Sequence, residues 1–217
     1  MLEPSRDAFS KDSTSPLSEG FDRAYFSSMY RDIDDPWGLS GHYYERRKRS
    51  VVMASLPRER FRRAFEPGCA TGELTGLLAQ RCDHLVASDF VPEALIAARQ
   101  RLAHDRHVEV ADMTVPNQWP EGTFDLILIS ELAYYLDDAA LTKLAEKVAT
   151  SLEKDGVLVA CHWKHAIEGA RHNAHAVHER LTVTTNLIHT VRHEETDFLL
   201  DVWCCDARSV AALEGII

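Results

Sequence analysis

The stretch Phe65-Glu66-Pro67-Gly68-Cys69-Ala70-Thr71-Gly72-Glu73-Leu74 connects an apolar, strand-like run to a helix-like run. A tight turn at such a junction brings the backbone close to a ligand, and only small residues permit that approach. The helix that follows offers free backbone N–H groups in its first turn. Its spacing differs from the Gly-x-Gly-x-x-Gly of nicotinamide-binding folds. By itself the stretch fits either a nucleotide-binding turn or an ordinary strand-to-helix connection.

Strand-like and helix-like runs alternate on both sides of this turn. The runs 126–129 and 157–160 are continuously apolar, as in strands buried on both faces. We expect strands at 62–66, 84–88, 107–110, 124–130 and 157–162, and helices at 72–80, 92–102 and 139–152. This alternation predicts an α/β fold with a mostly parallel, Rossmann-like sheet and helices on both faces. After a helix near 170–182, the runs 187–192 and 198–205 predict an edge hairpin with an antiparallel C-terminal strand.

The segments before the turn differ in composition from the α/β part. Residues 1–20 are polar and rich in Ser, Asp and Pro, which predicts disorder. Residues 21–58 mix aromatic and charged side chains, with one helix expected from the spacing of Phe21, Tyr25 and Met29 and another at about 42–56. We therefore expect a helical section over 21–58 that packs on a domain formed by 59–217.

Composition narrows the class of protein. A length of 217 residues suits one α/β domain with a modest appendage. No apolar run has the roughly 20 residues of a membrane helix, and the first residues lack a signal-peptide pattern. The five cysteines form no CxxC pair, so we expect reduced thiols and a cytoplasmic location. A net charge of −10 argues against a nucleic-acid partner, which binds basic surfaces.

Further polar residues follow the next strands, where doubly wound folds bind ligands. Asp89 ends the second strand; its carboxylate suits either the hydroxyls of a ribose or the start of the following helix. Asp112 and Met113 follow the third strand, where Asp112 fits either a ligand contact or a surface loop acid. The fourth strand ends at Ser130 and Glu131.

In this order the signals resemble the motifs of class I methyltransferases that use S-adenosylmethionine (SAM), with Ala70 in place of the middle glycine of the first motif. The resemblance implies their seven-stranded fold, SAM as cofactor and S-adenosylhomocysteine (SAH) as product. It also implies that Asp112 accepts the adenine amino group and that the Met113 N–H meets a ring nitrogen. The implied cofactor-binding residues are Glu66, Gly68, Ala70, Gly72, Asp89, Phe90, Asp112, Met113 and Ser130.

The segment after the fourth strand bears on the methyl acceptor. It reads Ser130-Glu131-Leu132-Ala133-Tyr134-Tyr135 and lacks the N/D-P-P-Y typical of enzymes that methylate base amino groups. Glu131 is able to hold an ammonium or take its proton, and Tyr134 and Tyr135 suit either a sugar contact or the core. His162 ends the fifth strand and is a candidate proton acceptor. We therefore predict Glu131, Tyr135 and His162 as catalytic residues.

Histidines also cluster after the fifth strand. His172, His175 and His178 have a spacing that places neighbours on one helical face, as a metal site or an exposed polar face requires. No carboxylate or cysteine completes a ligand set, so we predict no metal site.

Four stretches resemble one family. Residues 34–38 (DDPWG), 43–48 (YYERRK), 65–72 (FEPGCATG) and 161–165 (CHWKH) are similar to the nodulation N-methyltransferases of rhizobia (NodS). The resemblance implies methylation of the free amine at the non-reducing end of a deacetylated chitooligosaccharide, in Nod-factor synthesis, before N-acylation. The alternatives are a small-molecule O- or N-methyltransferase with a noncarbohydrate acceptor, and a SAM-binding protein without catalysis.

We further hypothesise that the helical section is a lid over the acceptor. Trp37, Tyr43, Tyr44 and Tyr134 are the predicted substrate contacts, although packing onto the core is the simpler role for many of these aromatics. Arg46 or Arg47 is a candidate for the SAM carboxylate, with a solvated charge run as the alternative.

Overall fold

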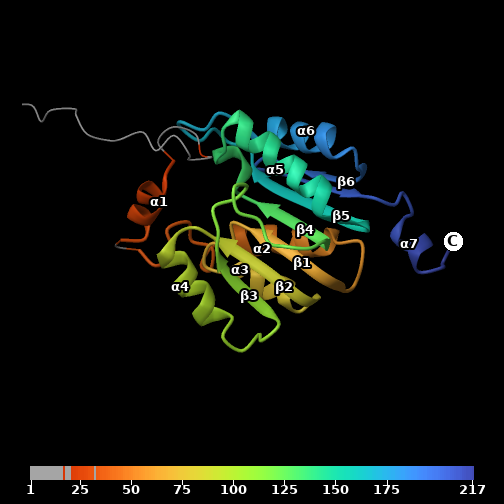
Figure 1. Ribbon diagram of the computed structural model, residues 1–217, viewed down its shortest axis with the longest axis horizontal. Helices are drawn as coiled ribbons and strands as arrows, with labels where there is room; N and C mark the ends of the chain where they lie inside the picture. The colour runs from red at the N-terminus through yellow and green to blue at the C-terminus, as the bar shows by residue number, and fades with distance from the viewer. Residues whose placement is uncertain (1–16, 18–20, 32) are drawn as a thin grey trace, which may run out of the picture.

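A mixed sheet forms the centre of the molecule (Figure 1). The computed structural model describes residues 17, 21–31 and 33–217. In these residues seven strands form one sheet in the order β3-β2-β1-β4-β5-β7-β6. Their bounds are β1 Phe61–Pro67, β2 Cys82–Asp89, β3 Val108–Asp112, β4 Phe124–Ser130, β5 Leu152–Trp163, β6 Ile188–Glu194 and β7 Phe198–Cys204. Strands β1 to β5 are parallel, and β7 runs antiparallel to β5 and β6. The predicted fold class is confirmed.

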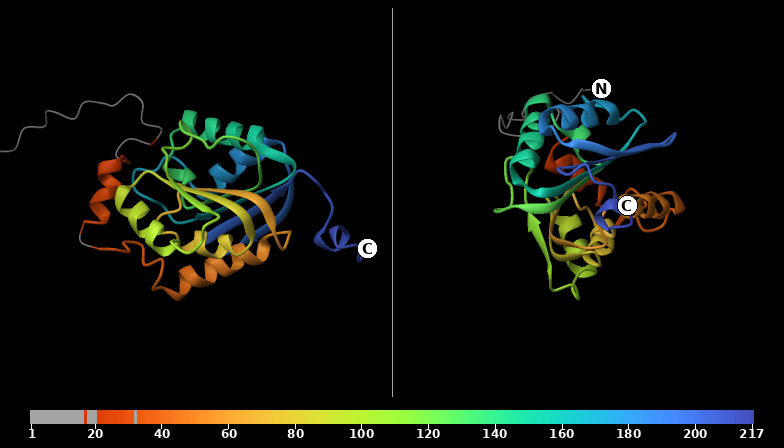
Figure 2. Two further views of the ribbon diagram at one scale, coloured as in Figure 1. Left: turned by 60° about the horizontal axis from the view of Figure 1, so that its bottom comes forward. Right: turned by 90° about the vertical axis from the view of Figure 1, so that its right-hand side faces the viewer.

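Helices cover both faces of this sheet (Figure 2). The helices are α1 Arg23–Met29, α2 Tyr43–Ser55, α3 Glu73–Ala79, α4 Pro92–Arg101, α5 Asp138–Ser151, α6 Ala174–Thr185 and α7 Val210–Leu213, with a 3-10 turn η1 at Ala133–Tyr135. One apolar cluster joins α2 and α3 to the sheet, and another joins α5 and α6 to the opposite face. Strand β4 supplies both, because Leu126 and Leu128 face the first and Ile127 and Ile129 face the second.

A buried carboxylate fixes the two central strands relative to each other. Asp125 of β4 is 1% exposed and accepts the backbone N–H groups of Arg62 and Arg63 in β1, each at 2.9 Å. These bonds hold the amino ends of β1 and β4 together. The carboxyl ends of β1 and β4 therefore lie side by side at the opposite end of the strands. Residues of α1 and α2 lie close to these carboxyl ends.

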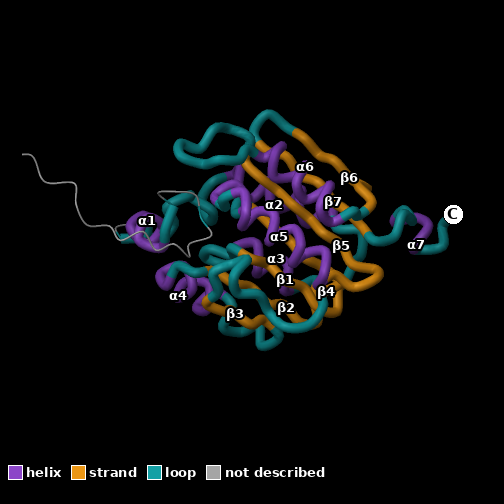
Figure 3. The backbone as a smooth tube through the Cα atoms, turned by 45° about the horizontal axis from the view of Figure 1, so that its top comes forward, coloured by secondary structure: helices purple, strands orange, loops and turns teal. Residues whose placement is uncertain are grey.

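Some boundaries differ from those expected. Strand β5 begins at Leu152 instead of 157, and α6 begins at Ala174 because the Asn173 side chain caps it by accepting the Ala176 N–H. The predicted C-terminal hairpin is present, but β7 lies between β5 and β6 (Figure 3).

Among the described residues of the section predicted to be helical, there are two helices, α1 and α2. The disorder predicted for residues 1–20 falls outside the described residues, except at Leu17, which forms an isolated bridge with Leu136. In the described part of the chain, no helix is long and apolar enough to cross a membrane.

Candidate functional site

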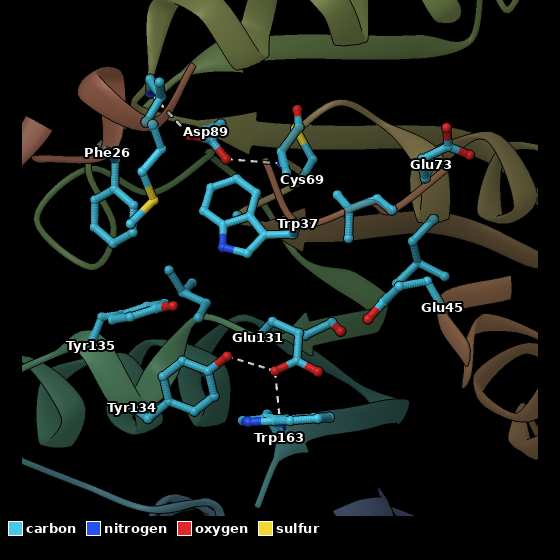
Figure 4. A pocket seen from close by; sticks show the side chains of 18 of the residues that line it. Phe26, Trp37, Glu45, Cys69, Glu73, Asp89, Glu131, Tyr134, Tyr135 and Trp163 are labelled. Atoms are coloured by element: carbon cyan, nitrogen blue, oxygen red, sulfur yellow. Dashed lines mark hydrogen bonds between the residues drawn. The ribbon is translucent and has the colours of Figure 1, made fainter. Parts of the chain in front are cut away.

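A cavity of about 570 Å³ lies at the carboxyl ends of β1, β2 and β4 (Figure 4). Helices α1 and α2 and the loop between them form its opposite wall. The predicted residues that line it are Glu66, Gly68, Ala70, Asp89, Phe90, Ser130, Glu131, Tyr134, Tyr135, Trp37 and Tyr44. The structure thus brings most of the predicted cofactor and substrate residues into one space.

The turn after β1 has an unusual backbone. Gly68, Ala70 and Gly72 have φ values of 76°, 47° and 80°. The left-handed region is unfavourable for alanine, and a hydrogen bond of 2.9 Å from the Ala70 N–H to Asp89 Oδ2 holds it there. At Gly68 an added Cβ would lie 3.3 Å from Leu132 Cβ. Gly72 does not line the cavity; it is the N-cap of α3.

Asp89 supports this turn and the start of α4 together. Oδ2 accepts the Ala70 N–H, and Oδ1 accepts the N–H groups of Phe90 and Val91 at 2.7 and 2.9 Å. Burial raises the pKa of Asp89 above its ordinary value, against the effect of these bonds. A carboxylate has about four acceptor positions, so one remains for a ligand in the cavity. Asp89 therefore supports the start of α4, one of its two predicted roles. Its remaining acceptor position also leaves room for the other, a bond to a ribose hydroxyl.

Glu66 contributes a buried acid to the same wall. The residue is 2% exposed, and its Oε2 has no hydrogen-bond partner among the described residues. Burial raises the pKa of Glu66 to about 8, and the nearby charge of Asp89 adds a smaller rise, against the lowering effect of Thr75. An orphaned carboxyl oxygen facing a cavity is a site for a hydrogen-bond donor or a cation.

This shift makes stability depend on pH. Between the ordinary pKa of 4.5 and about 8, folded Glu66 holds a proton that the unfolded chain has lost. Its contribution to the free energy of unfolding therefore falls as pH rises through this window and is constant above it. We expect Glu66→Gln to be more stable than the parent at pH 8.5 by roughly 2–5 kcal/mol and nearly equal at pH 5.

Urea unfolding of both proteins at pH 5, 7 and 8.5 measures this difference. The matched control is Glu59→Gln, which replaces an exposed acid and is expected to show no such slope. A stability difference between Glu66→Gln and the parent that does not change with pH would contradict the assignment.

Glu131 lies at the other end of the cavity (Figure 4). Its backbone is in the left-handed region, with φ 56°, and its N–H donates to Cys161 O at 3.0 Å. Lys48 Nζ donates to Oε1 at 2.7 Å, while the Tyr134 hydroxyl and the Trp163 N–H donate to Oε2 at 2.6 and 2.9 Å. These three bonds leave an acceptor position on Oε1. The carboxylate is thus fixed in orientation with one oxygen available.

Lys48 and Arg49 of α2 are site residues that the sequence interpretation missed. Lys48 is 5% exposed and also pairs with Glu45 at 3.0 Å. Burial opposes its charge, but Glu131 and Glu45 raise the pKa of Lys48 above its ordinary value, so it stays cationic. Arg49 lines the cavity and donates to Leu39 O at 2.7 Å. The signal was the YYERRK stretch, whose helical spacing aligns Tyr44 with Lys48.

Several predicted residues lie elsewhere. Arg46 donates to Gly41 O, and Arg47 forms a bidentate pair with Glu195, so neither is placed at the cavity. Tyr43 is 71% exposed and does not line the cavity.

The third strand supplies no lining residue. Asp112 pairs with Arg23 at 3.1 Å on the surface, and the Met113 N–H donates to Asp89 O at 2.9 Å. Neither residue is therefore placed in the cavity wall for its predicted adenine contact. The Asp112 side chain lies on the surface, and the Met113 N–H is already bonded to β2.

His162 is not placed to take a proton from a bound molecule. It is 0% exposed, does not line the cavity and uses both ring nitrogens in hydrogen bonds to Ala133 and His178. The predicted catalytic role therefore conflicts with its position.

The remaining histidines separate in the fold. His178 bonds to Asp201 in the interior, His175 pairs with Glu194, and His172 lies 3.5 Å from Asp138. Within the described residues, no group of three or more His, Cys, Asp or Glu side chains is arranged to hold a metal ion.

Comparisons with known proteins agree with this geometry. The chain is 37% identical over 113 residues to Nodulation protein S of Rhizobium tropici, an alignment covering 52% of this chain and 48% of that protein. It is 29% identical over 117 residues to phosphoethanolamine N-methyltransferase 1 of Arabidopsis thaliana, covering 52% and 24%. The chain therefore spans about half, or less, of the length of these curated relatives.

Solved structures match over more of the chain. A candidate methyltransferase from Pseudomonas syringae is 48% identical, with a TM-score of 0.68 and coverage of 75% of this chain and 99% of that one. N-methyltransferase NodS of Bradyrhizobium japonicum WM9, in complex with SAH, is 28% identical, with a TM-score of 0.76 and coverage of 84% and 98%. The profile of the family described as Nodulation protein S (NodS) matches residues 27–192. On this match, which takes in the cavity turn, Glu131 and α2, the chain belongs to the NodS family.

Proposed function

We propose that this protein is a SAM-dependent N-methyltransferase. The observation that carries the proposal is a single cavity with two different ends. One end has the left-handed turn at Gly68 and Ala70 with Asp89 beneath it, and the other has the fixed carboxylate of Glu131. The similar NodS structure in complex with SAH supports a nucleoside sulfonium as the cofactor.

The residues at the first end fit SAM. Oε2 of Glu66 is a buried acceptor without a partner, suited to the ammonium of the methionine part. Arg49 supplies a guanidinium from α2 on the opposite wall for the carboxylate, and Asp89 has one acceptor position for a ribose hydroxyl. SAM, when bound, supplies a methyl group on a sulfonium leaving group. The protein's own task is to align the acceptor and exclude water.

Glu131 is the residue that orients the acceptor nitrogen. Its open Oε1 position accepts an N–H of an amine, while Lys48 beside it disfavours a second cation. The bound amine is therefore held neutral, with its lone pair free. Burial raises the pKa of Tyr134 well above its ordinary value and that of Tyr135 to about 12, so both hydroxyls stay protonated. Tyr134 fixes Glu131, and Tyr135 is a wall residue.

For the acceptor we propose the amine of a deacetylated chitooligosaccharide. Family membership supports this choice, and the aromatic rings of Trp37, Tyr44 and Trp163 offer faces for a sugar. A second candidate is a small amine such as phosphoethanolamine, favoured by the similarity to the plant enzymes that carry this name. The predicted cytoplasmic location remains a prediction; all five cysteines are free thiols, as expected in a reducing compartment.

Transfer of a labelled methyl group from SAM tests the proposal. We expect label on deacetylated chitooligosaccharides and SAH as co-product, and at least tenfold less label on fully acetylated chains, because an amide nitrogen has no available lone pair. Phosphoethanolamine is the parallel acceptor. Preference for it would replace the sugar assignment, whereas equal labelling of the acetylated and deacetylated chains would exclude amine transfer.

A further inference from the structure

A chain of buried hydrogen bonds links the C-terminal hairpin to the segment that carries Glu131. Ala133 N lies 3.3 Å from His162 Nε2, His162 Nδ1 lies 2.9 Å from His178 Nε2, and His178 Nδ1 lies 2.8 Å from Asp201 Oδ2. His162, His178 and Asp201 are 0%, 1% and 0% exposed. They come from β5, α6 and β7, so the chain crosses three elements.

The direction of each bond follows from its two ends. The Ala133 amide is a donor only, so His162 Nε2 must accept and its proton must lie on Nδ1. That proton is donated to His178 Nε2, which places the proton of His178 on Nδ1, facing the Asp201 carboxylate. One charged acceptor and one backbone donor thus determine both tautomers.

The surroundings keep both rings neutral and Asp201 ionised. Burial, and then His178, hold the pKa of His162 well below its ordinary value. Burial also lowers the pKa of His178, against the raising effect of Asp201. Burial opposes the charge of Asp201, but bonds from Arg192 and His178 hold the pKa of Asp201 well below its ordinary value. Arg192 makes two bonds to this carboxylate, at 2.9 and 2.8 Å.

The end of β5 anchors the Glu131 segment at three successive residues. Cys161 O accepts the Glu131 N–H, His162 accepts the Ala133 N–H, and the Trp163 N–H donates to the Glu131 carboxylate. Glu131 has a left-handed backbone, which a residue other than glycine adopts only when its neighbours enforce it. Of the three β5 residues, only His162 acts through its side chain, and only its bond depends on a tautomer.

We propose that His162, His178 and Asp201 form a positioning relay that orients the Glu131 carboxylate toward the acceptor nitrogen. The proposal rests on the proposed function and adds residues that never touch substrate. Asp201 sets the tautomer of His178, His178 sets that of His162, and His162 holds the turn at Ala133. Tyr134, the next residue, is thereby placed to donate to Glu131. A buried polar chain of this kind is a device for orientation more than for stability.

Two substitutions at one position separate positioning from packing. Asparagine places its amide near the former Nδ1 and leaves the Ala133 N–H without an acceptor, whereas glutamine reaches the former Nε2 and offers an oxygen there. We expect His162→Asn to lower kcat at least tenfold with the Kd for SAM within about twofold. His162→Gln is expected to recover most of kcat. The matched control is His175→Gln on the exposed side of α6, which pairs with Glu194 outside the relay and is expected to behave as the parent.

Nitrogen-15 NMR of the imidazoles in the wild-type protein at pH 7 provides a readout independent of turnover. Protonated Nδ1 with unprotonated Nε2 is expected for both His162 and His178. The opposite tautomer or an imidazolium at His162 would overturn the relay, as would equal kcat for the asparagine and glutamine variants. Absence of methyl transfer by the wild type itself would instead reject the proposed function, since the NMR result stands apart from it.

Discussion

Asp89→Ala is expected to weaken SAM binding at least about 100-fold in isothermal titration calorimetry. The substitution removes the acceptor of three backbone N–H groups and the open position proposed for a ribose hydroxyl. Hydrogen bonds to charged groups contribute about 1.5–3 kcal/mol each, and about 1.4 kcal/mol is tenfold in affinity. Ala70 would also lose the bond that holds it in the left-handed region, so the turn would no longer be preorganised.

The control for this experiment lies on the same strand. Asp83→Ala removes an acid near the other end of β2, where its carboxylate pairs with Arg60 on the surface. Its Kd for SAM is expected to match the parent within twofold. Unchanged SAM affinity in a folded Asp89→Ala protein would remove the basis for the cofactor assignment.

Glu131→Gln is expected to lower kcat about 100- to 1,000-fold at saturating SAM and amine, a loss typical of removing one preorganised charged group. A carboxamide presents an NH₂ on one side, and both present oxygens face donors: Lys48 on one, Tyr134 and Trp163 on the other. The new NH₂ group would then face a donor on either side, so the substituted side chain would rotate. Its oxygen would no longer be oriented toward the acceptor amine. The Kd for SAM is expected to stay within threefold, since Glu131 lies at the proposed acceptor end, away from Asp89 (Figure 4).

Steady-state kinetics with the labelled-methyl assay and calorimetry with SAM check both parts. Glu146→Gln, on the exposed side of α5, is the matched control and is expected to behave as the parent. Glu131→Gln with full kcat would show that the acceptor amine is oriented by another group.

The contacts around Glu131 could not be predicted from the sequence. Lys48 and Glu131 are 83 positions apart, so no local pattern pairs them. The sequence predicts His162 near the end of β5, but the direction of its side chain depends on the pleat of the strand. Cys161 packs with the α2 and α3 face, so His162 points to the opposite face, toward α6 and His178. Helical spacing similarly grouped His172, His175 and His178, which the packing of α6 then divided among separate partners.

Local residue patterns were enough to predict the alternation of strands and helices, the parallel direction of the first five strands, and the small-residue turn between Glu66 and Gly72. Each depends on periodicity or on steric limits that a few adjacent residues impose. Three features follow only from packing between distant segments. Strand β7 lies between β5 and β6, α2 brings Lys48 and Arg49 to the cavity, and His162 bonds to the Ala133 N–H outside the cavity lining. These features depend on which distant side chains come into contact when the apolar faces are buried. The spacing of residues along the chain does not specify those contacts.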